Sequence, residues 1–426
     1  MEPRGGLVFT QKSSLPYNKL EHWPPLTYRN QTPVTRKELS DFKAFLNTEN
    51  NTGGDKELQP WIPFCDGRCA FCYFPVNCER KVYGIYLDAL KKVLNQYAET
   101  KYVKSTVFSE IYIGGGSPSV LSEDQTIDLL NYCQTKFNLS KDAPTKFTAC
   151  TTSLNSRKIK LYANHKVTQL DIGIQTFDPD LRKMLMLRDS SKVVCEKLAT
   201  AKKSGLGLSI DLLYNLPGQS LEQWEQDLKV ALSLEVESVD CYPIDLYSET
   251  PLAKKIASGE LPAAGDYKKE LQMYLKAYKL FKDNGYVPTC HNRFSRIKED
   301  SKTPSTEVIG SGAGFFMGLI NSMPYSDIEN VDAYITAVQK GDFPIARLTK
   351  LTPQEEMNQA IMMLYVRVPI NRENFKAKFG LLPEEAYPKA FEELRRKDLI
   401  TERDGIVRLS EKGDPWRFNI AWEFFK

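Results

Sequence analysis

The sequence predicts an α/β fold, a partial parallel barrel followed by a smaller C-terminal unit. Across residues 58–320, short apolar segments alternate with amphipathic segments of helical period, and about six such repeats follow one another. Alternation of this kind forms parallel βαβ units, and six of them make an incomplete (β/α)6 barrel. A chain of 426 residues exceeds the usual single domain. We therefore expect an N-terminal extension (1–57), a core (58–320) and a C-terminal domain (321–426).

The expected elements follow in order along the chain. The extension is rich in Pro, Asn, Thr and Gly, with one helix in TRKELSDFKAFL. The expected strands of the core are QPWIPF, EIYIGGG, KFTACT, LDIGIQTF, LSIDLLYNL and VDCYPIDLY. The helices are expected at 81–97, 123–137, 157–162, 192–203, 221–234 and 266–284. Ligands bind at the carboxyl ends of such strands, so motifs that follow them should share one rim.

The pattern of residues 351–426 predicts helices followed by two short strands in LITERDGIVRLSEKG, which an Asp-Gly turn joins. A helix before such a hairpin is typical of a winged-helix unit. This unit could bind DNA, but Asp and Glu are interleaved with its basic residues. The pattern therefore favours a lid or packing module.

Composition excludes several function classes. The formal net charge is +3 with 26% charged residues, which favours neither a nucleic-acid nor a membrane-surface partner. No apolar run approaches about 20 residues, and the first residues lack a secretory signal pattern. We expect a soluble, cytoplasmic protein. Its nine cysteines, odd in number and partly clustered, indicate reduced thiols and a metal site more than a disulfide framework.

The most informative motif is CxxxCxxC in WIPFCDGRCAFCYF, formed by Cys65, Cys69 and Cys72. Three thiolates on one loop can hold three irons of a 4Fe-4S cluster, while the fourth iron keeps an open position for a small molecule. An incomplete zinc site or buried thiols are the alternatives. Zinc usually takes four ligands in paired groups, and no CxxC or HxxxH pair follows downstream. Cys78 is not at a usual ligand spacing.

A second motif, YIGGGSPS, places three consecutive glycines directly after a predicted strand. Such a run costs backbone entropy and is tolerated where the main chain approaches a ligand closely or needs positive φ. A tight strand-to-helix turn is the alternative. On the same rim as the cysteine loop, the run is a candidate cradle for a ligand amino or carboxylate group.

These motifs resemble the HemN-like branch of the radical S-adenosylmethionine (SAM) superfamily. The resemblance rests on CxxxCxxC, GGGSPS, DIGIQTFD, SIDLLYNLPGQS and VIGSGAG in that order. It spans about residues 58–320, with a HemN-like C-terminal domain behind. The branch includes oxygen-independent coproporphyrinogen III oxidases, HemW-type haem chaperones, class C methyltransferases and anaerobilin synthases.

The resemblance implies a role for each matching residue. Cys65, Cys69 and Cys72 would ligate a 4Fe-4S cluster that binds SAM, whose reductive cleavage yields a 5′-deoxyadenosyl radical. Phe64 and Phe74 would shield the cluster, and Gly115, Gly116 and Ser117 would hold the methionyl end of SAM. Gln175, Arg188 and Asp211 would bind further polar groups of SAM. Gly312 and Ala313 would line the adenine or second-substrate side. Arg188 or Asp211 could instead form a structural ion pair.

Several residues differ from the pattern of the family, and the differences count against the coproporphyrinogen oxidases. Coproporphyrinogen oxidases carry another cysteine where this chain has Phe74, and a Tyr-x-His pair where it reads Gln59, Pro60 and Trp61. The family glutamate of the third strand is missing from KFTACTTS. Its substitutes there are Thr148, Cys150 or Thr152.

The segments VDCYPIDLYSETPLAKKIASGELP and CHNRFSR look most like anaerobilin synthases and class C methyltransferases. The resemblance implies transfer of a SAM-derived one-carbon unit to an sp2 carbon of a conjugated, tetrapyrrole-like substrate. It also implies one or two SAM molecules and an electron donor such as flavodoxin or ferredoxin. His291 and Arg293 are candidate substrate contacts, His as a haem-iron ligand and Arg toward a propionate. A haem chaperone and a coproporphyrinogen III oxidase are the alternatives.

Overall fold

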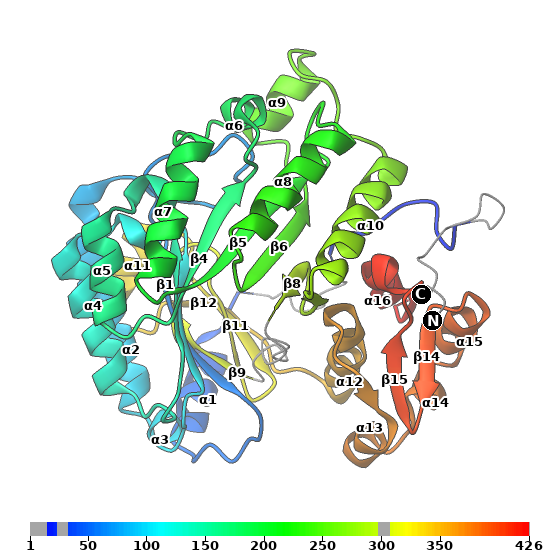
Figure 1. Ribbon diagram of the computed structural model, residues 1–426. Helices are drawn as coiled ribbons and strands as arrows, with labels where there is room; N and C mark the ends of the chain where they lie inside the picture. The colour runs from blue at the N-terminus through cyan, green and yellow to red at the C-terminus, as the bar shows by residue number, and fades with distance from the viewer. Residues whose placement is uncertain (1–14, 24–32, 297–306, 426) are drawn as a thin grey trace.

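The computed structural model describes residues 15–23, 33–296 and 307–425. They form a large α/β body and a smaller C-terminal body beside it (Figure 1). None of the helices in the described part combines the length and apolar character needed to span a bilayer.

Seven parallel strands form the centre of the large body, in the order β9-β1-β2-β3-β4-β5-β6. Their bounds are β1 (Lys56–Ile62), β2 (Glu110–Gly115), β3 (Thr145–Ala149), β4 (Gln169–Gln175), β5 (Gly207–Tyr214), β6 (Ser238–Pro243) and β9 (Glu307–Ser311). The parallel order of β1 to β6 confirms the predicted α/β fold. The seventh parallel strand, β9, comes from the late glycine segment and was not expected.

Antiparallel strands extend this sheet to twelve at its two edges. Three lie beyond β9 and two beyond β6; they are β10 (Met317–Ile320), β11 (Met323–Asp327), β12 (Ile345–Leu348), β8 (Arg293–Ser295) and β7 (Val287–Pro288). Short connections join β9 to β10, β10 to β11 and β7 to β8, whereas α11 lies between β11 and β12, and α9 and α10 lie between β6 and β8.

The longer helices lie along the outer side of the parallel strands, whereas the short α6 and α9 lie beyond the upper ends of the strands in the view of Figure 1. The helices are α2 (Tyr83–Ala98), α3 (Lys101–Lys104), α4 (Glu123–Lys136), α5 (Ser156–Asn164), α6 (Pro179–Met184), α7 (Ser191–Lys203), α8 (Leu221–Ser233), α9 (Pro251–Ala257) and α10 (Tyr267–Asp283), with α1 (Arg36–Phe45) before them and α11 (Val331–Gln339) after them. Capping boxes begin α4 and α8, where Ser122 pairs with Gln125 and Ser220 with Gln223. The long predicted helices agree with these bounds to within a few residues.

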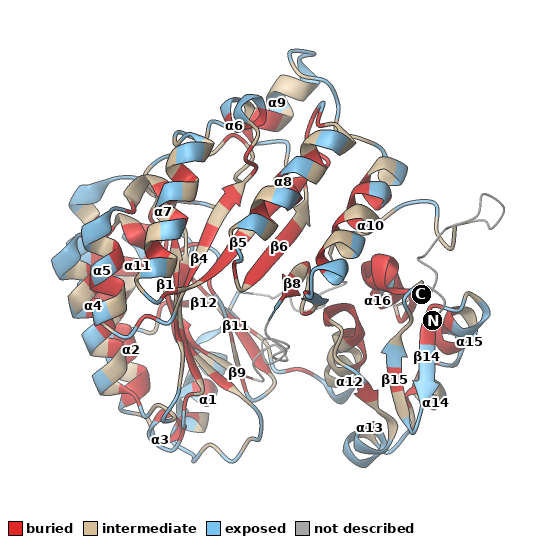
Figure 2. Ribbon diagram, in the orientation of Figure 1, coloured by how far each residue is buried: buried red, intermediate tan, exposed pale blue. Residues whose placement is uncertain are grey.

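Burial alternates along the strands because successive side chains point to opposite faces. In β1, Leu58 and Ile62 are fully buried in the layer shared with the helices. Gln59 and Trp61, on the other face, are each partly exposed. β4 shows the same alternation. Figure 2 shows the resulting pattern, with buried strands and helices that are buried on one side only. The inner face is therefore free to carry polar groups.

The small body has its own sheet, in the order β13-β15-β14. Its elements are α12 (Pro353–Met362), β13 (Ile370–Asn371), α13 (Arg372–Phe379), α14 (Pro383–Ala386), α15 (Pro388–Arg396), β14 (Ile400–Arg403), β15 (Ile406–Leu409) and α16 (Arg417–Glu423). Asp404 and Gly405 both adopt positive φ between β14 and β15, as a two-residue hairpin turn of type I′ requires. The predicted strand pair about this turn is confirmed.

The division of the chain differs in detail from the expected ranges. β11 and β12 complete the large sheet, and Ile345 and Leu348 belong to its core. We therefore propose a boundary near residue 350 in place of 321. Of the expected extension 1–57, residues 1–14 and 24–32 lie outside the described residues; Tyr17 packs against the small core and Phe42 belongs to the large one.

Arg367 connects the two bodies. Its guanidinium donates to the Asp414 carboxylate at 2.6 Å, to the Tyr274 hydroxyl at 2.8 Å and to the His291 carbonyl at 2.8 Å. Tyr274 lies in α10 of the large body, while Asp414 lies just before α16 of the small one. Because Arg367 and Asp414 are both almost fully buried, removing one partner leaves the other without its counter-charge.

We predict that Arg367→Met lowers the free energy of unfolding by about 3–5 kcal/mol, since it leaves the Asp414 carboxylate buried and unpaired. Urea unfolding measures this loss. Arg396→Met is the matched control, because Arg396 pairs with Glu393 on the exposed surface of α15 and such pairs contribute little. Equal stability of the two variants would contradict the prediction.

Candidate functional site

The motifs meet at the carboxyl ends of the parallel strands. The cysteine loop follows β1, the glycine run ends β2, Cys150 follows β3 and Gln175 ends β4. A cavity of about 720 Å³ opens at this rim. Cys65, Cys69, Ser117 and Arg188 line it.

The cysteine loop is held by backbone hydrogen bonds on both sides. Cys65 N–H donates to the Asn77 carbonyl at 3.2 Å, and Asn77 N–H donates to the Pro63 carbonyl at 2.8 Å. Within the loop, Cys72 N–H donates to the Cys69 carbonyl at 3.2 Å. These hydrogen bonds hold the loop between the end of β1 and the segment around Asn77.

Phe64 holds the start of the cysteine loop by packing into the apolar core. Its ring is fully buried, stacks on Tyr83 with centroids 4.0 Å apart and meets the edge of Tyr86 at 5.1 Å. Phe64 thus lies in the apolar core beside the first cysteine and does not line the cavity. This position fits apolar shielding of a bound group from behind.

The glycine run lets β2 approach the cysteine loop. Gly116 N–H donates to the Ile62 carbonyl at 2.8 Å, and Ser117 N–H donates to the Phe64 carbonyl at 2.6 Å. A Cβ atom on Gly116 would lie 2.5 Å from the Phe64 carbonyl oxygen and 3.0 Å from Cys65 Sγ. Gly115 adopts φ +121°, and a Cβ there would lie 2.4 Å from the Ile62 carbonyl oxygen. Only glycine fits at both positions.

The three thiols are partly buried and close enough to influence one another. Burial raises the pKa of Cys65 to about 12 and that of Cys69 to about 11, and neighbouring thiols add to both shifts. Burial also raises the pKa of Cys72. Iron binding needs thiolates, so the positive charge of a metal would have to offset this cost.

The donor set fits an iron-sulfur cluster better than a single ion. Among the described residues, no three Cys, His, Asp or Glu side chains converge as ligands of one metal ion. A 4Fe-4S cluster takes one thiolate per iron and therefore spaces its cysteines farther apart than one ion does. Three thiols on one loop, beside a cavity and against a glycine run, supply one thiolate for each of three irons.

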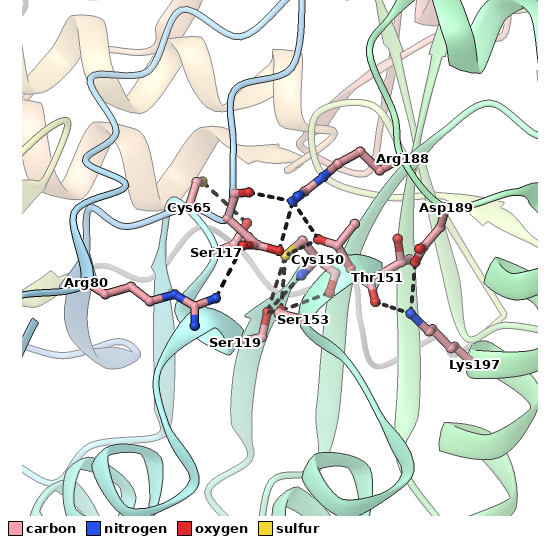
Figure 3. Close-up of polar contacts among 12 residues, drawn as sticks. Cys65, Arg80, Ser117, Ser119, Cys150, Thr151, Ser153, Arg188, Asp189 and Lys197 are labelled. Carbon is pink, nitrogen blue, oxygen red and sulfur yellow. Dashed lines mark hydrogen bonds and ion pairs between the residues drawn. The ribbon is translucent and has the colours of Figure 1, made fainter.

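Cys150 is a further thiol of this site. It lines the cavity at the end of β3 and influences the pKa of both Cys65 and Cys69. Its sulfur lies 3.1 Å from Ser153 Oγ and 3.4 Å from Thr152 Oγ1. Figure 3 shows Cys150 between the cysteine loop and the segment that carries Arg188. Of the three substitutes for the family glutamate, Cys150 and Thr152 reach the cavity.

Thr148 does not line the cavity and instead donates to the Tyr112 hydroxyl at 3.1 Å. The difference follows from strand geometry, since Thr148 lies within β3 and the other two lie beyond its end. The sequence alone gave no reason to choose among the three.

Arg188 lies at the mouth of the cavity. Its guanidinium donates to the Asp66 carboxylate at 2.8 Å and to Thr152 Oγ1 at 3.4 Å, and more than half of its side chain is exposed. It therefore ties the cysteine loop to the opposite wall (Figure 3). An exposed pair of this kind opens at small cost, so Arg188 can also turn to an incoming ligand.

Gln175 and Asp211 belong to the inner face of the barrel and do not line the cavity. Gln175 adopts φ +71°, a conformation that costs free energy for a residue with a side chain. A Cβ atom on Gly173 would lie 2.6 Å from Gln175 Nε2. Gly173 therefore makes room for the Gln175 amide over the strand end.

Asp211 is surrounded by other charged groups. Burial, followed by the nearby Asp240 and Asp171 carboxylates, raises its pKa to about 8, while Arg293 acts in the opposite direction. Arg293 donates to Asp240 Oδ2 from both Nε, at 2.9 Å, and Nη2, at 2.8 Å. Arg293 is thus an ion-pair partner inside the barrel, and the structure does not bring it to the cavity.

His291 lies at the junction of the two bodies, away from the cavity. Its carbonyl accepts from Arg367 and Arg417, and its ring meets the edge of Tyr365 with centroids 5.3 Å apart. Burial lowers its pKa to about 4, and nearby arginines add to the shift. The imidazole is therefore neutral at pH 7. The substrate roles of His291 and Arg293 stay predictions.

Gly312 and Ala313 lie beneath the rim and are buried. Gly312 N–H donates to Asp327 Oδ2 at 3.0 Å, and Ala313 N–H donates to the Tyr86 hydroxyl at 3.0 Å. Their backbone groups are thus engaged with the protein. These hydrogen bonds fix the path of the late glycine segment. The contact of Gly312 and Ala313 with SAM stays a prediction.

Between β4 and α7 sequence reasoning selected Arg188 alone, and it missed Arg182, Asp189 and the following Lys197. Arg182 is buried there and donates to the carbonyls of Thr176 at 2.8 Å and Asp189 at 2.8 Å. Lys197 donates to Asp189 Oδ2 at 2.9 Å and to the Thr151 carbonyl at 2.7 Å (Figure 3). These contacts build the far wall of the cavity. The preceding motif DIGIQTFD and the predicted Arg188 were the signals that pointed to this segment.

Comparison with known proteins identifies the family. The radical SAM superfamily model matches residues 60–231, and the HemN C-terminal domain model matches residues 351–416. The chain belongs to the HemN-like radical SAM family. Membership implies a 4Fe-4S cluster and SAM as cofactors.

Relatives within the HemN-like family cover most of the chain. Anaerobilin synthase of Escherichia coli O157:H7 is 23% identical over 93% of this chain and 89% of its own. Heme chaperone HemW of Bacillus subtilis (strain 168) is 26% identical over 83% of this chain and 94% of its own. The structure of coproporphyrinogen III oxidase (HemN) from Escherichia coli aligns with a TM-score of 0.82 over 95% of this chain and 96% of that one, at 17% identity. This likeness shows the shared fold.

Asp327 in β11 supports the late glycine segment, and burial raises its pKa to about 7. An unfolded Asp has a pKa near 3.9, so the folded chain binds more protons than the unfolded chain between about pH 4 and 7. Stability from this group is full below pH 4 and is lost as the pH rises to about 7. We predict that Asp327→Asn flattens this fall in a pH series of urea unfolding. A slope identical to that of the unaltered protein would contradict the prediction.

Proposed function

We propose that this protein is an enzyme that cleaves SAM at a 4Fe-4S cluster and transfers a SAM-derived one-carbon unit to an sp2 carbon. The substrate we propose is conjugated and tetrapyrrole-like, as haem is. The observation that carries the proposal is that Cys65, Cys69 and Ser117 line one cavity, with Cys72 on the same loop, in a chain that matches anaerobilin synthase over 93% of its length. An electron donor such as flavodoxin or ferredoxin belongs to the same proposal.

The chain's own residues would bind and orient SAM. A reduced 4Fe-4S cluster, when bound, supplies the electron that cleaves the sulfonium of SAM. Cys65, Cys69 and Cys72 would hold the cluster, and Ser117 and Arg188 offer hydrogen bonds to the polar ends of SAM. The cavity volume of about 720 Å³ lies within the range of small-molecule pockets. Fixed placement beside the target atom is what such chemistry needs from a protein.

A haem-binding chaperone is the second candidate, because the chain is 26% identical to HemW over 83% of its length. A chaperone would retain haem without cleaving SAM. Oxidation of coproporphyrinogen ranks third: the fold is shared with HemN, but Phe74 and Gln59 stand where the oxidases carry a cysteine and part of a Tyr-x-His pair.

The deciding experiment is anaerobic reconstitution with iron, sulfide, a reductant and SAM, followed by incubation with haem and mass spectrometry. The proposal expects 5′-deoxyadenosine, S-adenosylhomocysteine and a product that has gained a one-carbon unit. The ratio of the two nucleosides reports whether one or two SAM molecules are consumed. Haem retention with neither nucleoside would favour the chaperone, and carbon dioxide release from coproporphyrinogen would favour the oxidase.

Four thiols near the cavity allow a sharper test of which three hold the cluster. We predict that Cys69→Ala lowers iron content after reconstitution and reduces SAM cleavage below detection, because one iron loses its ligand. Cys150→Ala should keep the iron content and the cluster absorbance while weakening SAM binding. Exposed Cys78→Ala is the control and should change neither quantity. Loss of iron in Cys150→Ala would overturn the assignment.

A further inference from the structure

Four aromatic side chains meet beside the cysteine loop, and we call them the aromatic bridge: Tyr73, Phe74, Tyr247 and Phe315. Tyr73 stacks on Tyr247, with centroids 4.0 Å apart, and on Phe74, with centroids 4.9 Å apart. Phe315 meets the edges of Tyr73 and Phe74 at 5.8 and 5.3 Å, with planes inclined by 69° and 71°. The bridge is thus a column of three nearly parallel rings with a fourth ring standing upright beside it.

The bridge joins segments that the sheet keeps far apart. Tyr247 follows β6, Phe315 follows β9, and five strands lie between β6 and β9 in the sheet. Tyr73 of the cysteine loop nevertheless contacts both side chains. The parallel strands must therefore curve until the loops at their two ends meet, and the bridge crosses the mouth of the partial barrel.

The bridge is attached to the cysteine loop itself. Tyr73 directly follows Cys72, and Phe74 comes next in sequence. The loop that carries Phe315 packs against the start of the same loop, since a Cβ atom on Gly314 would lie 3.6 Å from Pro63 and 3.6 Å from the Trp61 indole nitrogen. A ligand on the bridge would therefore lie next to the thiols.

The bridge also offers apolar surface to solvent. Phe315 is 41% exposed, and the neighbouring Leu246 and Met317 are 39% and 43% exposed. The other three rings are half-buried. The nearby Asp245 carboxylate accepts from the Trp23 indole at 2.6 Å, so this charge is already engaged. A flat apolar ring fits such a surface better than a charged segment does, because aromatic faces favour offset or edge-on rings.

We propose that the aromatic bridge binds the planar conjugated ring of the substrate, which adds to the column of rings and rests against Phe315. This inference rests on the proposed function, because it names the surface that presents the substrate to the cluster. It assigns specificity to Tyr247 and Phe315, two residues for which the resemblance implied no role. Both act by contact with the substrate ring and not on the cluster.

Binding of two planar probes, metal-free protoporphyrin IX and haem, tests the proposal on the reconstituted full-length protein. Tyr247→Leu and Phe315→Leu should each weaken binding of both probes about 5-fold to 10-fold, since each removes one ring contact. Tyr247→Phe keeps the ring and should bind as the unaltered protein does. Phe379→Leu, an aromatic change in the small body, is the control. Iron content and SAM binding should stay unchanged in all four variants, which separates a lost ring contact from a misfolded cysteine loop.

Each outcome decides between alternatives. Unchanged probe affinity in both leucine variants, or no probe binding by the unaltered protein, would overturn the proposal. Intact probe binding with slower cluster reduction by flavodoxin would assign the surface to the electron donor instead and overturn it as well. Weakened probe binding in a protein that forms no one-carbon product would support the bridge while refuting the proposed function.

Discussion

The close approach of two backbones, the end of β1 and the glycine run of β2, is the constraint on which the site depends. Gly116 and Ser117 donate hydrogen bonds to the carbonyls of Ile62 and Phe64, the residues that lead into Cys65. A side chain on either Gly115 or Gly116 would overlap with these carbonyl oxygens. The contact brings Ser117 to within 3.5 Å of Cys65 Sγ. Without it, the cysteine loop and the cavity would not share one rim.

Several charged side chains lie inside the barrel. Carboxylates on β4, β5 and β6 face inward, and Arg293 of β8 neutralises part of their charge through Asp240. Because like charges in a buried space disfavour ionisation, Asp211 keeps a raised pKa. The barrel interior is thus polar but not uniformly charged. Such an interior can accept hydrogen bonds from a bound molecule next to a hydrophobic mouth formed by the aromatic bridge.

The small body is coupled to the barrel through the segment that carries His291. Arg367 and Arg417 both bind the His291 carbonyl, so the position of this segment depends on the small body. A change in the small body could therefore alter the strand β8 and its Arg293. This coupling gives the HemN C-terminal domain a structural role toward the barrel, which agrees with the packing module that its mixed charge favoured.

The sequence by itself determined the alternation of strands and helices, the Asp-Gly hairpin and the order of the motifs, because these depend on local periodicity and turn chemistry. It also placed the cysteine loop and the glycine run on one rim, since parallel strands end on the same side. Only the tertiary structure decided that Cys150 and Thr152 reach the cavity, that Arg293 pairs with Asp240, and that Tyr247 and Phe315 meet through Tyr73. These contacts join residues far apart in the chain, and the curvature of the sheet sets them.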